Sequence, residues 1–417
     1  MSSLPDDNSK KQLKPFDGIR VVDFTHVLAG PTATYQLAVM GADVIKIERP
    51  GSGDDTRQWG PPFISVDGGK NEESLYFLAT NRGKRSITLN LSDPRGQRVI
   101  NELVPHCDVL VENFKVGALA RYGLDYETLK QLNPELVYCS ITGFGQDGPY
   151  AERAGYDFMM QGMGGLMSVT GEAQDVAGAN PQKVGVAIAD IVTGLYCASA
   201  IQAALIHRNQ TGQGQYIDMA LLDCQVAILA NQAMTYLAAG ETPVRMGNAH
   251  PNIVPYQVFE TKDGHIILAV GNDGQFQRFC EVTGQTQLAE DPRFTANRDR
   301  VQNRTELVLI LSSLMKTRDT SEWLALLEPE GVPCGRINRV DETLNDPQVL
   351  HRQMRVSAQH SSLGAMDLLG SPRKLAATPG EVRRAPPVLG EDTDTVLRDL
   401  LGYPEKTINA LHDDGVV

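Results

Sequence analysis

The sequence lacks the residue spacings that usually hold metals or redox centres. Its six cysteines are scattered without any C-x-x-C pair, and its eight histidines form no H-x-x-x-H pair. We therefore expect no metal site, and we expect the cysteines to be free, mostly buried thiols of a reducing compartment. These features predict a cytoplasmic protein without a permanently bound cofactor.

Glycine is plentiful, but it does not occur in the patterns that cradle a phosphate. Gly162, Gly164 and Gly165 start a G-x-G-x-x-G motif, yet Met167 occupies the place of the third glycine. The stretch also does not follow the first predicted strand, so it is not a dinucleotide-binding fingerprint. The sequence contains no G-x-x-x-x-G-K-[ST] loop and no G-x-S-x-G elbow, which excludes those two families of active site.

Basic residues are in the minority. Lys and Arg number 38 against 51 Asp and Glu, which gives a net charge of −13. Such a chain is a poor partner for nucleic acid, because phosphate contacts need a positive surface. Residues 1–12 are expected to form a disordered tail, since this polar segment with Asp6 and Asp7 resembles no signal or transit peptide. We expect neither nucleic acid nor a membrane as a partner.

One apolar run extends from Val184 to about Ile206, and Asp190 is its only charge. The run is long enough to suggest a membrane span, but polar residues within it favour a buried helix. Alternation over residues 184–188 predicts the end of a strand, and the Ala-rich segment after Asp190 predicts a helix. Asp190 would lie in the first turn, where the helix dipole favours an anion. Two interpretations stay open here: a buried N-cap, or a desolvated carboxylate presented to a ligand.

The chain up to residue 224 alternates predicted strands and helices, which is typical of a doubly wound α/β fold with a parallel sheet. From Arg245 the pattern changes, with a hairpin turn at residues 262–264 and helices near 274–283 and 304–314. We predict a Rossmann-like large domain at residues 13–224 and 331–417, and a smaller α+β domain at residues 225–330.

Ligands of parallel sheets collect at the carboxyl ends of the strands, which here points to His26–Ala29 and Arg49. Arg and Lys near strand ends supply the donors that a phosphate-bearing cofactor requires, although each charge alone is more often a solvated surface residue. Together with a desolvated aspartate, this set suggests acyl-coenzyme chemistry with Asp190 as a nucleophile. The basic set comprises Arg49, Arg82, Lys84, Arg85, Lys115 and Arg121.

Several segments resemble the class III coenzyme A transferases, the CaiB/BaiF family that includes formyl-CoA transferase and carnitine CoA-transferase. The resemblance covers about residues 13–417 and implies an enzyme of two domains, in which two subunits are threaded through one another as an interlocked homodimer. It rests on Gly18–His26, Ala29–Pro31, Gly41–Asp54, Asn81–Ser86, Val111–Phe114, Thr211–Gln215 and Leu389–Thr393.

The resemblance also implies roles for individual residues. It assigns the family's aspartate nucleophile to Asp190. It assigns the binding of coenzyme A or acyl-CoA, as substrate, to thirteen positions: His26, Val27, Leu28, Ala29, Arg49, Leu89, Asn113, Phe114, Lys115, Arg121, Arg153, Tyr156 and Asp157.

Two departures from formyl-CoA transferase concern the substrate. Leu28 stands where that enzyme has a glutamine, and residues 247–256 replace its tetraglycine loop. The stretch with His250 and Tyr256 is similar to the succinyl-CoA–glutarate CoA-transferase branch. We therefore expect succinyl-CoA as donor and a dicarboxylate such as glutarate as acceptor, with these two as substrate residues, although His250 could equally be a turn or core histidine.

Three alternatives remain open. Racemases of acyl-CoA esters resemble this chain around residues 155–157, but they carry a histidine base where Tyr156 stands, and a phenol is a poor substitute for imidazole in proton abstraction. A non-catalytic coenzyme-binding homologue is disfavoured by intact Asp190 and Arg49. A purely structural α/β protein is disfavoured because so many signatures occur together.

Overall fold

The structure is a computed structural model that describes residues 13–66 and 72–417. The tail predicted at residues 1–12 lies outside the described residues. The chain divides into two compact units. The larger, here called the sheet unit, comprises the chain up to Leu166, Val184–Ala230 and Pro347–Val417, and the small unit comprises Met167–Lys183 and Asn231–Asp346.

The unit boundaries differ from the predicted ones, 224/225 and 330/331, in three places, one of which is residues 225–230, which belong to the sheet unit. Residues 331–346 belong to the small unit, where β11 (Cys334–Gly335) pairs with β10 (His265–Ala269). Residues 167–183 belong to the small unit as well. The pairing of β11 with β10 decides that residues 331–346 belong to the small unit, and local hydrophobic patterning does not reveal this pairing.

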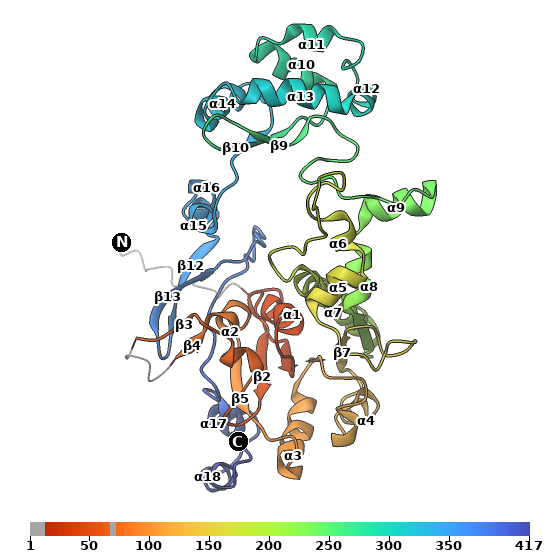
Figure 1. Ribbon diagram of the computed structural model, residues 1–417. Coiled ribbons are helices and arrows are strands. Elements are labelled where there is room, and N and C mark those ends of the chain that lie inside the picture. Colours follow the sequence, from red (N-terminus) through yellow and green to blue (C-terminus); the bar gives the residue numbers. More distant parts are fainter. Residues whose placement is uncertain (1–12, 67–71) are drawn as a thin grey trace, which may run out of the picture. The chain divides into compact units, whose positions relative to one another are not determined.

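A six-stranded sheet lies at the centre of the sheet unit (Figure 1). Every pair of neighbouring strands is parallel, which confirms the parallel α/β sheet expected from the alternating pattern. In spatial order the strands are β5 (Arg85–Thr88), β2 (Asp43–Glu48), β1 (Arg20–Asp23), β6 (Val109–Glu112), β7 (Val137–Thr142) and β8 (Tyr216–Ala220).

The strand order reverses at β1. The chain first adds β2 and β5 on one side of β1, and then returns to add β6, β7 and β8 on the other side. The segments that follow β1 and β6 therefore leave the sheet in a crevice at its carboxyl edge. Such a switch point is where open parallel sheets bind their ligands.

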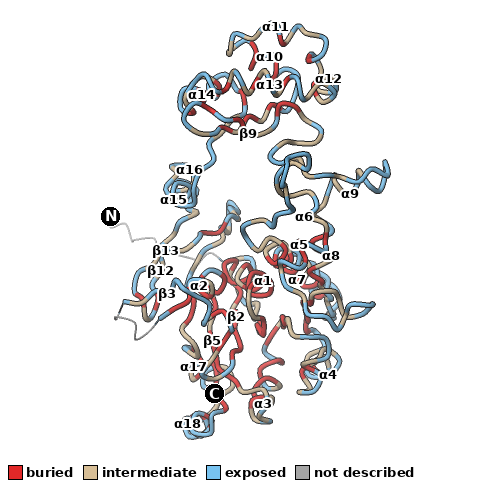
Figure 2. Tube along the Cα trace, in the orientation of Figure 1, coloured by how far each residue is buried: buried red, intermediate tan, exposed pale blue. Residues whose placement is uncertain are grey.

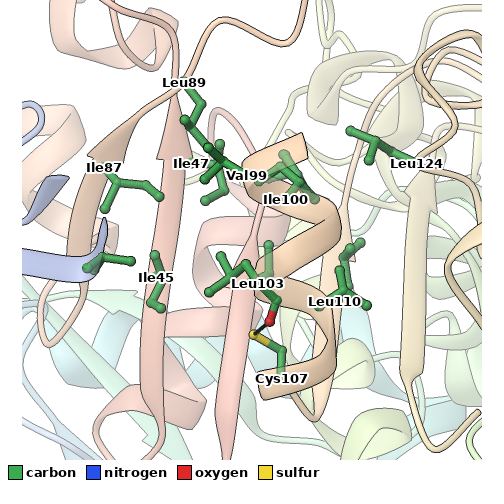
Figure 3. Packing of buried hydrophobic residues seen from close by; sticks show 14 of the residues in the cluster. Ile45, Ile47, Ile87, Leu89, Val99, Ile100, Leu103, Cys107, Leu110 and Leu124 are labelled. Atoms are coloured by element: carbon green, nitrogen blue, oxygen red, sulfur yellow. Dashed lines mark hydrogen bonds between the residues drawn. The ribbon is translucent and has the colours of Figure 1, made fainter. Parts of the chain in front are cut away.

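Helices cover both faces of the sheet. Alternation along β1 sends Val21 into one hydrophobic cluster and Val22 into the other. Figure 3 shows the Val22 side, where Ile45 and Ile87 of the strands face Ile100 of a covering helix. The Val21 face is covered by α1 (Ala29–Ala38), α5 (Asp157–Met163), α7 (Ile188–Thr211) and α8 (Leu221–Ala227), and the Val22 face by α3 (Pro94–Leu103), η2 (Val104–His106), α4 (Tyr126–Leu132), η4 (Val396–Leu400) and α18 (Glu405–Asp413).

Helix α7 confirms the helix predicted for the long apolar run. Among the described residues it is the one helix long and apolar enough to cross a membrane, and 50% of its most apolar window is buried within the structure. It packs closely on α1, because a Cβ atom at Gly194 would lie 2.7 Å from the Thr32 Cβ atom. The strand predicted over residues 184–188 was wrong: residues 184–187 form a loop, and α7 begins at Ile188. The Val184 amide donates to the Gln161 side chain at 2.8 Å.

The segment that follows β8 forms two helices. Helix α8 ends at Ala227, and α9 (Ala230–Ala239) begins at Ala230, whose φ of 46° is left-handed. All residues of α9 are exposed or half-buried, as Figure 2 shows. The other elements of the sheet unit and its boundaries are η1 (Asp55–Gln58), β3 (Phe63–Ile64), β4 (Glu73–Ser74), α2 (Leu75–Thr80), η3 (Ala120–Tyr122), α6 (Leu166–Val169), α16 (Pro347–His351), β12 (Arg355–His360), β13 (Gly364–Leu369) and α17 (Thr393–Thr395).

The small unit is an α+β structure with its own core. The predicted hairpin is confirmed, since β9 (Tyr256–Glu260) and β10 pair antiparallel around residues 261–264. Phe276, Phe279 and Trp323 are buried between this sheet and its helices. These helices are α10 (Asp273–Val282), α11 (Thr286–Glu290), α12 (Asn297–Gln302), α13 (Arg304–Met315), α14 (Thr320–Leu327) and α15 (Val340–Leu344).

The six cysteines are free thiols, as predicted. Five of them are buried, and Cys334 is half-buried.

Candidate active site

A cavity of about 190 Å³ lies in the sheet unit at the carboxyl ends of β1, β6 and β7. It is the crevice expected at the switch point of the sheet. The start of α1, the first turn of α7 and the loop before α5 complete its walls. The lining residues are His26, Val27, Leu28, Ala29, Asn113, Phe114, Lys115, Val116, Ile141, Thr142, Gly143, Ala151, Glu152, Arg153, Ala154, Gly155, Tyr156, Asp190 and Leu221.

The loops after β1 and β6 are clamped together across the switch point. The amide of His26 donates to Asn113 Oδ1 at 2.8 Å, and Asn113 Nδ2 donates to the His26 carbonyl at 2.8 Å. The rings of His26 and Phe114 meet edge-on with centroids 5.2 Å apart. Burial, followed by the nearby Lys46, lowers the pKa of His26, so its imidazole is neutral at pH 7.

Buried ion pairs support the loop that follows β1. Val27 has a φ of 68°, which a β-branched residue rarely adopts, and its amide donates to Asp54 Oδ1 at 3.3 Å. Lys46 Nζ contacts Asp54 Oδ2 at 2.9 Å and donates to the Thr25 carbonyl at 2.5 Å. Burial alone would raise the pKa of Asp54, but Lys46 and His26 outweigh it and hold the pKa below its usual range. The strained backbone therefore rests on a charged and fully buried support.

Asp190 is the third residue of α7 and is only 7% exposed. Within the described residues its carboxylate has neither a hydrogen-bond donor nor a cation beside it. Burial, and secondly the charge of Asp157, raise the pKa of Asp190 to about 7. The sequence predicted that the helix start favours the ionised form of this group, whereas burial and the charge of Asp157 favour the protonated form. The carboxylate is therefore close to half-protonated at neutral pH.

The N-cap interpretation of Asp190 was wrong. Ala187 occupies the N-cap position of α7 and offers no side-chain bond. The carboxylate that serves the first turn comes from another helix: Asp157 Oδ1 accepts the amide of Ala189 at 2.9 Å. Asp157 Oδ2 also accepts from Gln161 at 2.8 Å. This leaves the Asp190 oxygens uncommitted at the cavity wall.

Two glycines bring the loop of residues 151–156 against the end of β7. A Cβ atom at Gly155 would lie 2.5 Å from the Gly143 Cα atom, and one at Gly143 would lie 2.7 Å from the Gly155 Cα atom. Only glycine permits this approach. Tyr156, which follows Gly155 and is exposed, lines the same cavity as Asp190.

The predicted coenzyme-binding residues separate into two groups. His26–Ala29, Asn113–Lys115, Arg153 and Tyr156 line the cavity, and the Arg153 guanidinium stacks over Tyr150 at 4.5 Å. The others do not line it. Arg49 is exposed and pairs with Asp55, Leu89 is a core residue, Arg121 lies over Tyr122, and Asp157 supports α7.

The prediction of solvent-facing phosphate donors at residues 82–85 was wrong. Lys84 is fully buried against Asp23, with 2.8 Å between Nζ and Oδ2. Arg85 pairs with Asp43, and the Arg82 guanidinium lies 4.0 Å from the Tyr35 ring centroid. Lys84 and Arg85 are thus paired with carboxylates of β1 and β2, and Arg82 is buried against the Tyr35 ring.

The candidate substrate residues His250 and Tyr256 belong to the small unit, where they contact each other. Their ring centroids are 5.2 Å apart, and the His250 amide donates to the Tyr256 carbonyl at 2.9 Å. His250 Nδ1 also accepts from the Asn252 amide at 3.0 Å. His250 therefore stabilises a turn, which was one of its two predicted roles.

Tyr76 of α2 is a residue that the sequence did not single out. Burial, and then the charges of Asp190 and Asp157, raise the pKa of this phenol. Its ring packs edge-on against Trp59 with centroids 5.0 Å apart. No local motif marks it, because its proximity to Asp190 arises only in the folded sheet unit.

The arrangement can activate a carboxylate for attack on a bound electrophile. A desolvated carboxylate is a stronger nucleophile than a hydrated one, and it faces a mixed apolar and basic cavity. No group of three or more His, Cys, Asp or Glu side chains among residues 13–66 and 72–417 could hold a metal ion. The fold and cavity thus define an α/β protein with a candidate ligand site at the switch point of a parallel sheet.

Comparison with known proteins gives the family. The model of CoA-transferase family III matches residues 16–393, and the chain belongs to this family of enzymes. A succinate–glutarate CoA-transferase of Agrobacterium fabrum is 51% identical over 386 residues, which cover 93% of this chain and 96% of that protein. A succinyl-CoA:glutarate CoA-transferase of Homo sapiens is 43% identical over 405 residues, which cover 97% and 90%. A crystal structure of a CaiB/BaiF family protein from Brucella suis has a TM-score of 0.82 at 49% identity and covers 93% of this chain and 100% of that one.

Proposed function

We propose that this enzyme transfers coenzyme A from succinyl-CoA to a dicarboxylate such as glutarate, with Asp190 as the nucleophile. The observation that carries the proposal is the buried Asp190 carboxylate at the cavity wall, free of any bound donor or cation among the described residues. The names of two relatives, at 51% and 43% identity, support the choice of donor and acceptor.

The reaction divides into four balanced steps. The Asp190 carboxylate attacks the thioester carbonyl, the C–S bond breaks, and coenzyme A leaves as a thiolate from a mixed anhydride. The thiolate then attacks the aspartyl carbonyl, which releases succinate and leaves an aspartyl-CoA thioester. The acceptor carboxylate attacks this thioester to form a second anhydride and the thiolate. The thiolate finally attacks the acceptor's carbonyl, which gives the new acyl-CoA and restores Asp190.

The start of α1 supplies donors for the developing oxyanions. Helix α1 has no side-chain cap, and its N-cap residue Leu28 and its first residue Ala29 line the cavity. The orphan amides of a helix start carry partial positive charge, and they stabilise negative charge that develops on a carbonyl oxygen.

Coenzyme A is assigned to the cavity-lining residues. Lys115 and Arg153 are the exposed cations that would meet its phosphates. Arg49, Leu89 and Arg121 keep their assignment from the family resemblance, outside the cavity walls. His250 and Tyr256 remain the proposed substrate residues.

The proposal includes an interlocked homodimer in the cytoplasm. Helix α7 has an exposed apolar face, with Leu195 at 46%, Tyr196 at 43% and Ile206 at 60% exposure. A second copy of the chain would cover such a face. Light scattering of the purified protein tests this, since a monomeric mass would contradict it. The free thiols support a reducing compartment.

The test of the nucleophile is Asp190→Ala, measured with succinyl-CoA and glutarate. We expect kcat to fall by at least about 10⁴-fold, because no other group forms the anhydride.

Since Asp190 must be ionised to attack, kcat/KM of the wild type should rise with pH through about 7 and level off above it. Hydroxylamine should trap wild-type Asp190 as a hydroxamate, detected by peptide mass spectrometry. Turnover retained by a folded variant would refute the assignment.

A further inference from the structure

We infer that Glu112 is a positioning residue, which sets the place of the loop of residues 113–115 in the coenzyme cavity. This inference rests on the proposed function for the identity of the ligand. Glu112 does not line the coenzyme cavity, so it would act through its neighbours.

The first observation is a hydrogen bond at the end of β6. Glu112 is its last residue and is 6% exposed. Its Oε2 atom accepts the amide of Phe114 at 2.8 Å, which closes a tight turn directly after the strand. One buried carboxylate therefore determines where the chain leaves the sheet.

The second observation is what this turn carries. Asn113 and Phe114 both contact His26. The Asn113 side chain makes two hydrogen bonds to the His26 backbone, and the Phe114 ring meets the His26 ring edge-on. Lys115, which follows, is one of the two exposed cations of the cavity. The Glu112 bond thus fixes three wall residues together with the neighbouring loop after β1.

The third observation is a second cavity, of about 140 Å³, which Glu112 lines. Ser140 stands between Glu112 and Gln146, whose Nε2 donates to Ser140 Oγ at 2.9 Å. The rings of Tyr138 and Tyr216 stack behind it with centroids 5.7 Å apart. The ionisable groups that line this cavity beside Glu112 are Lys115, Asp125, Tyr126, Tyr138 and Tyr216.

Within the described residues Glu112 has no ion-pair partner. Burial raises the pKa of Glu112 to about 7, although the bonds to Ser140 and to the Phe114 amide oppose the rise. The ionised form accepts the Phe114 amide more strongly than the neutral form does. The loop is therefore held more firmly above pH 7 than below it, and coenzyme A should bind more tightly as the pH rises through this value.

Two substitutions separate positioning from a merely structural role. Glu112→Met removes the acceptor at nearly constant size and should raise the KM for acyl-CoA about tenfold, with a smaller change in kcat. Glu112→Gln keeps an acceptor oxygen for Phe114 and should restore KM to within about twofold. Glu135, which is exposed at the amino end of β7, provides the matched controls Glu135→Met and Glu135→Gln, which should leave KM unchanged.

Equilibrium binding of coenzyme A gives a readout that does not depend on turnover. It is measured by calorimetry between pH 5.5 and 8.5 in an Asp190→Asn background, so that Asp190 does not titrate. With Glu112 present, affinity should rise about fivefold to tenfold more across this range than with Glu112→Gln. The phosphate of coenzyme A titrates in both proteins, so its contribution cancels in the comparison.

The outcomes distinguish this inference from the proposed function. Equal KM values for Glu112→Met and the wild type, in a wild type that transfers coenzyme A, would overturn the inference alone. A wild type that binds coenzyme A but transfers none would overturn the proposed function and leave the binding comparison decisive. If Glu112→Met does not fold, identical pH profiles for Glu112 and Glu112→Gln still refute the inference.

Discussion

The sheet unit contains two regions of buried carboxylates that differ in their partners. Beside β1 and β2, Asp23 pairs with Lys84, Asp54 with Lys46, and Glu48 with Arg57, each within 3 Å. Across the switch point, at the end of β6 and the start of α7, Glu112 and Asp190 form no ion pair within the described chain.

Burial raises the carboxyl pKa in both regions, and the cations decide the outcome. With them, the pKa values of Asp23, Glu48 and Asp54 fall below their usual range. Without them, those of Glu112 and Asp190 rise to about 7. The paired region is a stable support for the strained loop after β1. In the unpaired region the carboxylates of Glu112 and Asp190 keep the cost of desolvation. For Asp190 a poorly solvated carboxylate is what the proposed nucleophilic role requires.

Removing one cation from the paired region should have the largest effect on stability. Lys46→Met leaves Asp54 buried without its partner and should lower the free energy of unfolding by about 3–5 kcal/mol. Denaturant unfolding measures this change. Lys130→Met is the control, since Lys130 pairs on the surface with Glu127 and should matter by less than about 1 kcal/mol. Equal effects of both substitutions would contradict the comparison.

Replacing the unpaired carboxylate of Asp190 by a neutral side chain should stabilise the folded protein. The pKa of Asp190 is raised in the folded state, so folding favours its protonated form, and the penalty grows as pH rises from about 4 to about 7. Asp190→Asn should therefore raise the free energy of unfolding by up to roughly 4 kcal/mol at pH 8 and by little at pH 4. Thermal unfolding at both pH values measures this difference.

The control for this prediction is Asp147→Asn, because Asp147 is exposed. It should show no such dependence on pH. A variant at Asp190 that is less stable than the wild type at pH 8 would show that the carboxylate has stabilising partners in solution.

The smallest effect on stability is expected at an exposed cation. Arg49 pairs with Asp55 at 2.7 Å, but both side chains are more than half exposed. Arg49→Gln should change the free energy of unfolding by less than about 0.5 kcal/mol. If Arg49 contacts coenzyme A, as proposed, the KM for acyl-CoA should nevertheless rise several-fold. An unchanged KM would remove Arg49 from the proposed binding set.

Local pattern predicted the parallel sheet and the placement of Asp190 in a first helical turn, because both follow from periodicity along the chain. It failed at residues 184–188, where the partner of the Val184 amide is the distant Gln161. It failed at the N-cap for the same reason, since Asp157 of α5 serves the first turn of α7.

The basic set shows the same limit. Lys84 and Lys115 both belong to the basic set near predicted strand ends. In the structure Lys84 is fully buried and Lys115 is exposed. The partner that buries Lys84 is Asp23, 61 residues away. A charge that will be neutralised in the core cannot be told from one that will meet solvent until the strand order is known.

The close approach of α1 and α7 has a consequence for how the site tolerates change. At Gly194, backbone and small side chains touch, with the Ala29 carbonyl 2.8 Å from where a Cβ atom would be. Helix α7 carries Asp190, the proposed nucleophile, and the start of α1 lines the same cavity, so this close contact sets the separation of the two helices. Larger side chains elsewhere can be exchanged and repacked while this distance stays constant. The distance between Asp190 and the start of α1 should therefore change little when surrounding residues are substituted. A substitution at Gly194 should change it, because a Cβ atom there would force the two helices apart.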